Sequence, residues 1–354
     1  MILRRRPSAR TNLLILLALA MGITTFCGSD EFDQVDRTGY ELTFDRASAE
    51  SANIFRVDGT GASLDMVTPA DMGGIGGVWS PDGRTLVFSG VSDGVLGIWI
   101  LDTATGDARL LAETPLYDGV PTWSPDSTMV AFTRGLPDDY EVFVLDVSSG
   151  ELTNLTGEDP DNGWNRWPGW SPDSERIAYV SNRDGEEEIH VIDVQDRITV
   201  QMTFNSTWDG PPTFSPDGTK IAFGRVVGPN DDGIFVMNAD GTGVTRVTES
   251  AGRDNDLFPV WSSDGTLLAF TRTTSSGTGL FTVNVEDFRQ VAVTDEASSI
   301  RGVSWSPDDA LFAFTLEDSG EIVVVDAHGR EPREIGQIGD NVDWRPNVIA
   351  PSSP

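Results

Sequence analysis

The chain has 354 residues, 38% of them hydrophobic, which is enough for one large all-β domain or two ordinary domains and excludes a chain disordered throughout. With 56 Asp and Glu against 24 Lys and Arg, its net charge of -32 opposes binding to nucleic acid or anionic lipid; it leaves basic proteins, cationic ligands and divalent metals as compatible partners, or serves solubility alone. The single cysteine, Cys27, excludes an internal disulfide framework and a cysteine-based zinc cluster.

The N-terminal segment has the order of charge and hydrophobicity that is typical of a secretory signal. Arg4, Arg5 and Arg6 precede an apolar run over residues 13–20, which is shorter than the roughly 20 residues of a membrane span. Cys27 ends the segment, and the stretch resembles a bacterial lipoprotein signal in which Cys27 becomes the lipidated first residue. We expect a signal peptide over residues 1–26, an acidic tether over residues 27–38 and a membrane anchor at Cys27.

Two alternatives to lipidation are compatible with the same segment. Ala18-Leu19-Ala20 has the small-x-small pattern of an ordinary signal peptidase site, which would release a soluble secreted protein. Otherwise the hydrophobic run is retained as an anchor. All three outcomes place the mature domain outside the cytoplasm, in the periplasm or at the cell surface.

A motif of the form aromatic-Ser-Pro-Asp-Gly recurs six times with small variations. The copies are Trp79–Gly83, Trp123–Ser127, Trp170–Ser174, Phe214–Gly218, Trp261–Gly265 and Trp305–Asp309. Their aromatic residues advance by 44, 47, 44, 47 and 44 positions, which is the period of a four-stranded propeller blade. The spacing therefore predicts a tandem array of blades.

Each unit between two copies of the motif contains segments with the alternation expected of strands, such as residues 85–89, 97–102 and 109–111. Ser-Pro-Asp-Gly has the composition of a type I turn, so the motif should join the innermost strand of a blade to the next strand. We expect the motif tryptophans to pack between blades, where a large ring fills the wedge between twisted sheets.

The two ends of the chain supply the pieces of one further blade. Residues 41–44, 53–58 and 64–68 match the second, third and fourth strands of a unit, and residues 342–347 resemble a lone first strand with its turn. Pairing these pieces closes the ring and removes its free edges. We therefore expect an all-β fold over residues 39–347, a seven-bladed β-propeller of four-stranded antiparallel blades, closed by pairing of the C-terminal strand with the N-terminal strands and followed by a tail over residues 348–354.

The motif followed by strands such as residues 221–223 and 234–243 resembles the repeat of TolB-like, WD-type β-propellers, over about residues 40–347. Proteins with similar repeats include periplasmic proteins that bind a peptidoglycan-associated lipoprotein, the propeller domains of prolyl-oligopeptidase-like peptidases, and many lipoproteins. The resemblance therefore implies a fold and no single function. Members such as TolB carry an α/β domain before a six-bladed ring, whereas for this chain we expect a tether at that place and seven blades.

No assembled catalytic set is visible, so we expect no enzymatic activity and no catalytic residues. Residues 90–94 satisfy the Gly-x-Ser-x-Gly pattern of a hydrolase, but strands flank them on both sides where a nucleophile elbow needs a strand and then a helix. His190 and His328 have no partner at metal-site spacing. We expect no cofactor, with Ca²⁺ as an option at acidic clusters such as residues 159–162, 231–232 and 254–256.

Aromatic residues outside the motif indicate a binding surface. Tyr117, Trp164 and Trp208 each lie six residues before a motif aromatic, so they should share one face of the ring, with Trp167 nearby. Five residues before the motif aromatic, successive units carry acidic or amide side chains, expected to ring the mouth of a central channel: Asp118, Asn165, Asp209 and Asp256. Such a surface suits a peptide, a basic protein patch or a sugar. Alternatively, the rings cover the inner strands, the Asp side chains bond loop amides, and Arg166 and Arg301 neutralise carboxylates.

The leading hypothesis is a monomeric, non-catalytic binding scaffold of the cell envelope, anchored to a membrane by lipid, with an envelope protein or peptide as its partner. The alternative is an envelope enzyme, a glycan lyase or hydrolase with a metal-assisted site at the channel mouth. A third possibility is a structural role among other surface proteins.

Overall fold

The structure, a computed structural model, describes residues 39–47, 52–114, 119, 121–136, 139–157, 163–228, 232–249, 255–294, 299–329 and 332–346. The predicted signal peptide, Cys27, the tether and the C-terminal tail lie outside the described residues. Within these ranges, no helix is long and apolar enough to cross a membrane.

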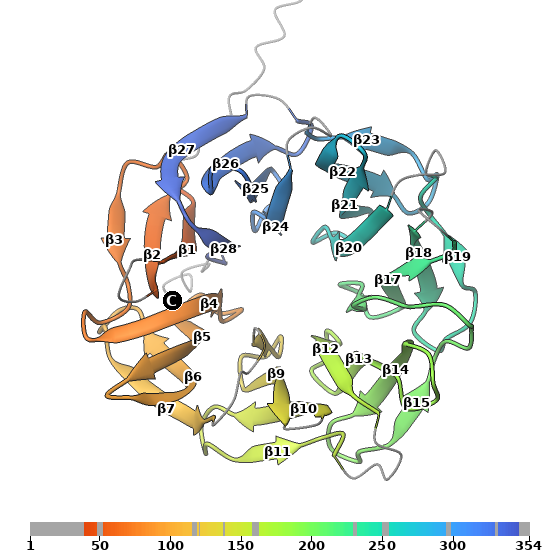
Figure 1. The fold of residues 1–354 in the computed structure, drawn as a ribbon, viewed down its shortest axis with the longest axis horizontal. Helices are drawn as coiled ribbons and strands as arrows, with labels where there is room; N and C mark the ends of the chain where they lie inside the picture. The colour runs from red at the N-terminus through yellow and green to blue at the C-terminus, as the bar shows by residue number, and fades with distance from the viewer. Residues whose placement is uncertain are drawn as a thin grey trace, which may run out of the picture. The chain divides into compact units, whose positions relative to one another are not determined.

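The described residues form 28 strands, which pair in groups of four and lie around a ring (Figure 1). The first two groups are β4 (Met72–Trp79), β5 (Thr85–Ser92), β6 (Val95–Asp102) and β7 (Ala108–Glu113), then β8 (Thr122–Trp123), β9 (Met129–Leu136), β10 (Asp139–Asp146) and β11 (Leu152–Asn154). The next two are β12 (Asn165–Trp170), β13 (Arg176–Ser181), β14 (Glu188–Asp193) and β15 (Thr199–Gln201), then β16 (Thr213–Phe214), β17 (Lys220–Val226), β18 (Asp232–Asn238) and β19 (Thr245–Arg246).

Two further groups follow along the chain: β20 (Asn255–Trp261), β21 (Leu267–Thr274), β22 (Gly277–Asn284) and β23 (Gln290–Ala292), then β24 (Ile300–Trp305), β25 (Leu311–Leu316), β26 (Glu321–Asp326) and β27 (Arg333–Ile338). Pairing within these groups is antiparallel, and one parallel bridge between Asp232 and Asn255 links β18 to β20. The prediction of an all-β fold made of four-stranded antiparallel sheets is confirmed.

The remaining group combines both ends of the chain. β28 (Asp340–Trp344) pairs with β1 (Glu41–Ala47), which continues to β2 (Ala52–Asp58) and β3 (Leu64–Met66). The register places Leu42 opposite Trp344 and Thr43 opposite Asp343. The segment around Trp344 therefore lies beside the segment around Phe44, as the sequence analysis expects.

The hydrophobic core is divided among the junctions between neighbouring sheets. Each of seven buried clusters combines side chains from two sheets that are consecutive around the ring. One of them packs Leu42, Phe44 and Trp344 against Leu311 and Ile322 of the preceding sheet. Every junction, including the two that involve the chain ends, is thus held by apolar burial.

The motif tryptophans lie at these junctions, and all of them except Trp79, whose Nε1 is buried without a partner, also hydrogen-bond across a junction. The Nε1 of Trp123 donates to the carbonyl oxygen of Val78 at 3.1 Å, and the Nε1 of Trp344 donates to that of Ser304 at 3.2 Å. Trp170, Trp261 and Trp305 make the equivalent bond to the residue just before the motif aromatic of the preceding sheet. The predicted packing of these rings between sheets is confirmed, and the hydrogen bond satisfies the one polar atom of a buried indole.

The Ser-Pro-Asp-Gly segments form the expected turns between the first and second strands of each group. In the turn between β4 and β5, Gly83 N donates to Ser80 O at 2.7 Å, and Gly83 has a φ of 67°. The Ser80 hydroxyl donates to Asp82 at 2.6 Å and accepts a bond from Thr85 N. The turn is thus fixed by its own side chains, which explains why the same residue types recur in each unit.

We predict that Trp344→Ala lowers the free energy of unfolding by roughly 3–5 kcal/mol, because it opens a cavity at a sheet junction and removes an indole hydrogen bond. Guanidinium denaturation followed by fluorescence measures the change. The control is Phe204→Ala, since Phe204 is 77% exposed and its loss should cost less than about 0.5 kcal/mol. Equal effects of the two substitutions would contradict the role assigned to Trp344.

Two carboxyl groups beside the β1–β28 pair make stability depend on pH. Burial raises the pKa of both Asp45 and Asp343 to about 6. Asp45 accepts a bond from Gly76 N at 3.0 Å, and Asp343 accepts one from Trp79 N at 2.9 Å. Because the folded-state pKa lies above the ordinary value of 3.8, the stabilisation is complete below pH 3.8 and is lost as the pH rises through 6.

We therefore predict that the melting temperature falls between pH 5 and pH 8, and that Asp45→Asn with Asp343→Asn makes the profile flatter than that of the wild type. Each carboxyl contributes at most about 1.4 kcal/mol per pH unit. Asp146→Asn is the control, because hydrogen bonds from Ser149 and Ser148 lower the pKa of Asp146 to about 2, outside the range tested. An unchanged slope in the double variant would refute the assignment.

Candidate binding site where three sheets meet

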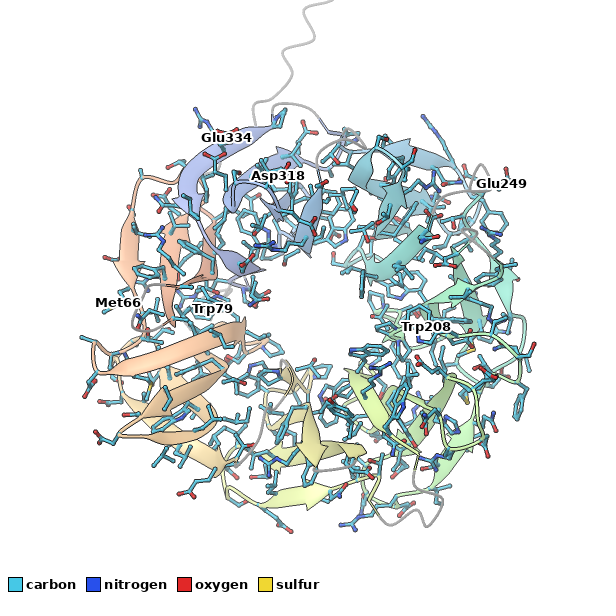
Figure 2. All side chains as sticks on the ribbon, in the orientation of Figure 1. Met66, Trp79, Trp208, Glu249, Asp318 and Glu334 are labelled. Carbon is cyan, nitrogen blue, oxygen red and sulfur yellow. The ribbon has the colours of Figure 1, made fainter. Side chains whose placement is uncertain are left out.

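The structure describes six of the eight residues that the sequence singles out for binding; Tyr117 and Asp118 lie outside the described residues. Trp164 immediately precedes β12, Asn165 and Trp167 lie in it, Trp208 and Asp209 precede β16, and Asp256 lies in β20. All belong to the innermost strands or the loops that enter them. Figure 2 shows Trp208 near the inner edge of the ring, whereas Met66 lies at its outer edge.

The acidic residues of this set face arginines of their own sheets and not the solvent. Asp209 is fully buried and accepts two bonds from Arg225, at 2.6 and 2.7 Å. Asp256 is fully buried and accepts two from Arg272, at 2.6 and 2.8 Å. Both carboxylates are thus paired with arginines, whereas the sequence analysis gave them two other roles, either open at a channel mouth or bonded to loop amides.

The side chain of Asn165 is also buried, and its polar atoms are hydrogen-bonded. Its amide donates to Glu141 at 3.1 Å and to the Gly163 carbonyl at 3.0 Å, while its oxygen accepts a bond from Arg183 at 3.3 Å. An amide in place of the carboxylate thus joins the loop to two neighbouring sheets. Its contribution is to position the loop that carries Trp164.

The arginines that pair with these carboxylates were not recognised in the sequence. Arg225 lies over Phe223 and Phe235, at 5.1 and 5.2 Å from the ring centroids, and Arg272 lies over Phe270 and Phe281 in the same way. Arg46 and Arg134 cover equivalent phenylalanine pairs. The signal that could have found them is Phe-x-Arg, as at residues 223–225 and 270–272, with arginine sixteen positions after the buried aspartate (209 to 225, 256 to 272).

The aromatic residues of the set gather around one arginine. The Arg166 guanidinium carbon lies 3.8 Å from the ring centroid of Trp164 and 3.9 Å from that of Trp167. Trp167 and Trp208 meet edge to face with centroids 6.3 Å apart. The guanidinium thus lies over two indoles at short distance, which is the favoured geometry for a cation at an aromatic ring.

The charge of Arg166 is balanced by the carboxylate of Glu187. Its Nη2 lies 3.3 Å from Glu187 Oε1 and 3.4 Å from Oε2. Burial raises the pKa of Glu187, against the opposing effect of Arg166. Arg166 Nε is buried and has no hydrogen-bond partner. The guanidinium is therefore less fully paired than those of Arg225 and Arg272.

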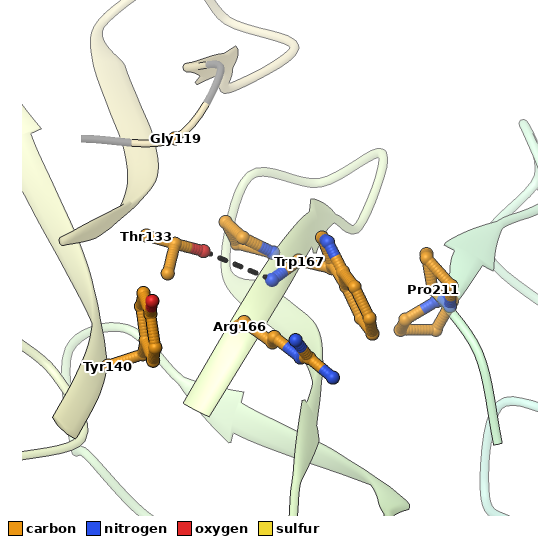
Figure 3. Close-up of a pocket in the computed structure, with 8 residues that line it drawn as sticks. Gly119, Thr133, Tyr140, Arg166, Trp167 and Pro211 are labelled. Atoms are coloured by element: carbon orange, nitrogen blue, oxygen red, sulfur yellow. Dashed lines mark hydrogen bonds between the residues drawn. The ribbon is translucent and has the colours of Figure 1, made fainter. Parts of the chain in front are cut away.

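A pocket of about 450 Å³ opens beside this cluster, between the sheets of β8–β11, β12–β15 and β16–β19. Figure 3 shows the indole of Trp167 between Arg166 and Pro211, with Tyr140 across the pocket. The lining consists of Gly119, Thr133, Tyr140, Arg166, Trp167, Pro168, Pro211 and Pro212. A volume of this size, walled by aromatic and proline rings with a few polar groups, suits a side chain or a short segment of a partner.

The backbone of Trp167 is held in an unusual conformation. Trp167 has a φ of 58°, where β12 loses register with β13 between Arg166 and Gly169. Its N–H donates to Thr133 Oγ1 of the neighbouring sheet at 3.1 Å. Left-handed backbone is an outlier for so bulky a residue, and strain of this kind is concentrated at functional sites.

The other sequence expectations on chemistry are partly outside the described residues. Of the acidic clusters weighed for calcium, residues 159–162, 231 and 254 are not described. In the described part of the chain, no three His, Cys, Asp or Glu side chains are placed to hold one metal ion. Residues 90–94 form the hairpin between β5 and β6, with Ser92 opposite Val95. The Gly-x-Ser-x-Gly pattern therefore lies in a hairpin, as expected from the strands on both sides of it.

These features define an all-β repeat protein whose sheets lie around a ring and whose inner loops line a pocket. The family model of the TolB β-propeller domain matches residues 137–346. The chain belongs to this family, and the resemblance found in its repeats is confirmed.

Curated relatives agree with that assignment. The Tol-Pal system protein TolB of Gluconobacter oxydans is 34% identical over 262 residues, covering 71% of this chain and 55% of the relative. TolB of Francisella tularensis subsp. mediasiatica is 26% identical over 239 residues, covering 65% and 53%. The chain thus spans about half the length of these relatives.

The solved structures show the fold alone. TolB from Acinetobacter baumannii superposes with a TM-score of 0.56 and 15% identity, over 88% of this chain and 68% of that one. An oligogalacturonate lyase in complex with manganese reaches 0.63 with 17% identity, over 83% and 84%.

We predict that Asp209→Ala lowers the free energy of unfolding by roughly 3–5 kcal/mol, because it leaves Arg225 buried without its partner. Replacing both residues, with Asp209→Ala and Arg225→Leu, should recover much of that loss. Chemical denaturation measures both. Asp340→Ala is the matched control, since the Arg301–Asp340 pair is nearly half exposed on each side and should cost less than about 1 kcal/mol. Similar losses at Asp209 and Asp340 would rule out the structural role.

Proposed function

We propose that this protein is a non-catalytic binding scaffold outside the cytoplasm, which holds an envelope protein or peptide in the pocket at Trp167. The observation that carries the proposal is the Trp164–Arg166–Trp167 stack beside a pocket of about 450 Å³. Aromatic and arginine side chains are the residues that contribute most to protein interfaces. Membership of the TolB β-propeller domain family supports a role in protein interaction at the envelope.

We further propose that the scaffold is a closed propeller of seven blades. The β1–β28 pairing and the seven interior clusters, one for each junction between consecutive sheets, support this count. Closure would hold the pocket rigidly, because the inner strands that carry it have neighbours on both sides. A rigid pocket keeps the entropic cost of binding low.

The location outside the cytoplasm and the lipid anchor at Cys27 are part of the proposal. They rest on the order of charge and hydrophobicity before Cys27. The net charge of -32 keeps such a surface away from anionic lipid headgroups, so a tether between anchor and scaffold is compatible with it.

The alternative of an envelope enzyme acting on glycans has one observation in its favour, the similarity in fold to an oligogalacturonate lyase in complex with manganese. A likeness at 17% identity concerns the fold and does not transfer a site. Among the described residues, those that line the pocket at Trp167 include no pair of carboxylates that could act as acid and base. Binding is therefore the function that the site supports best.

We predict that a photo-crosslinking amino acid at Tyr140, which lines the pocket and is 48% exposed, captures a partner in intact cells. The same label at Phe288, 44% exposed in the turn between β22 and β23, is the control. The double variant Trp164→Ala, Trp208→Ala should reduce the crosslinked product several-fold, because it removes rings that support the pocket. Equal products from both labelled positions would count against this pocket.

A further inference from the structure

Within the residues that the structure describes, five of the seven innermost strands have a β-bulge three residues before the motif aromatic, which we call the bulge position. The residues there are Gly76, Trp167, Phe258, Gly302 and Asn341, with φ values of 63°, 58°, 56°, 63° and 51°. In each case the register with the neighbouring strand breaks at this point. The bulge is therefore a repeated feature of the fold that requires left-handed backbone.

Two kinds of residue occupy the bulge position. Gly76, Gly302 and Asn341 are the types that adopt left-handed backbone at low cost. Trp167 and Phe258 are bulky aromatics, for which the same conformation is strained. Packing does not account for Phe258, because its side chain is 57% exposed. Backbone conformation alone would favour glycine at both positions, yet each carries an aromatic side chain.

The strained aromatics lie on either side of a proline pair. Trp167-Pro168, Pro211-Pro212 and Phe258-Pro259 occupy the same two positions in three consecutive units, and β16 contacts both β12 and β20. The approach is close: a Cβ on Gly169 of β12 would lie 2.7 Å from the Pro212 carbonyl oxygen. Trp167 and Pro211 line the same pocket, and Phe258 occupies the equivalent position on the next inner strand; we call these three residues the apolar arc.

Charge recognition does not explain the arc. The buried carboxylates of these sheets, Asp209 and Asp256, are already paired with Arg225 and Arg272. Pro211 and Pro212 have no N–H to donate, so the centre of the arc offers little to the hydroxyl groups of a glycan. What remains is apolar surface at three successive points, which favours an extended polypeptide carrying large apolar side chains.

We infer that the arc binds one extended segment of a partner protein through two apolar anchors, one in the pocket at Trp167 and one against Phe258. The inference deepens the proposed function and rests on it. Packed sheets lie about 10 Å apart, so two steps between sheets span at most roughly 20 Å. An extended chain covers that distance in about six residues. The expected ligand therefore has two large apolar residues about six positions apart.

The experiment uses defined synthetic peptides and not an unidentified partner. Fluorescein-labelled Gly/Ser dodecapeptides carry either two tryptophans six positions apart or one tryptophan, and binding to the full chain is followed by fluorescence anisotropy. We expect the two-tryptophan peptide to bind the wild type at least about 5-fold more tightly than the one-tryptophan peptide, because the second anchor adds an interface contact. Phe258→Gly should abolish that advantage.

Phe288→Gly is the matched control. Phe288 is also an exposed phenylalanine with left-handed backbone, at 44% exposure and a φ of 59°, but it lies in the turn between β22 and β23. Both substitutions relieve the same strain, so thermal melting should find both variants folded. Phe288→Gly should keep the advantage of the two-tryptophan peptide.

The outcomes separate this inference from the proposed function. If Trp167→Gly weakens both peptides at least 5-fold while Phe258→Gly leaves the advantage intact, the pocket stands and the arc is overturned. If the wild type binds neither peptide, or binds a galacturonate hexasaccharide instead, the peptide-binding function and the arc both fail. Loss of the advantage in Phe258→Gly alone supports the arc.

Discussion

The structure depends on how the edge of each sheet is joined to the next. At five junctions an indole N–H donates to a backbone carbonyl of the preceding sheet, at the residue just before that sheet's own motif aromatic. The same rings take part in the buried clusters at the junctions. One residue type therefore supplies both the apolar burial and the directional bond that sets the position of one sheet against its neighbour. Where Phe214 replaces tryptophan, only the packing remains.

The same constraint shapes the inner strands. Since each sheet must approach its neighbour closely near the centre, the inner strand bends through a bulge, and its backbone there becomes left-handed. N–H groups freed by the bulge find acceptors across the junction: Gly76 N bonds to Asp45, and Trp167 N bonds to Thr133. The bulge is thus a repeated feature of the inner strands, and the side chain of Trp167 at this position lines the pocket.

The arginines near the inner strands are of two kinds, which differ in how their charge is paired. Arg225 and Arg272 lie on phenylalanine pairs and neutralise fully buried carboxylates, so they close the inner end of the core. Arg166 is instead held between two indoles and is only loosely paired with Glu187. The first arrangement is stable because both charges are satisfied. The second leaves a polar edge beside an apolar pocket, which is the combination found in binding sites.

The sequence by itself determined the strands, the turns, the place of the motif tryptophans and the pairing of residues near Phe44 with those near Trp344. These depend on local turn chemistry and on a period that recurs six times, and both are visible along the chain. It also predicted that Tyr117, Trp164 and Trp208 share one face, of which Tyr117 lies outside the described residues. Only the tertiary structure decided that Asp209 and Asp256 are occupied by arginines, that Arg166 is enclosed by indoles, and that Trp167 and Phe258 share a strained bulge. For Asp209 and Asp256 the reason is that pairing is settled between strands sixteen residues apart, where periodicity places a residue on a strand but does not identify its neighbours. For Arg166 the indoles are close in the chain, but periodicity specifies neither side-chain conformations nor the left-handed backbone at Trp167.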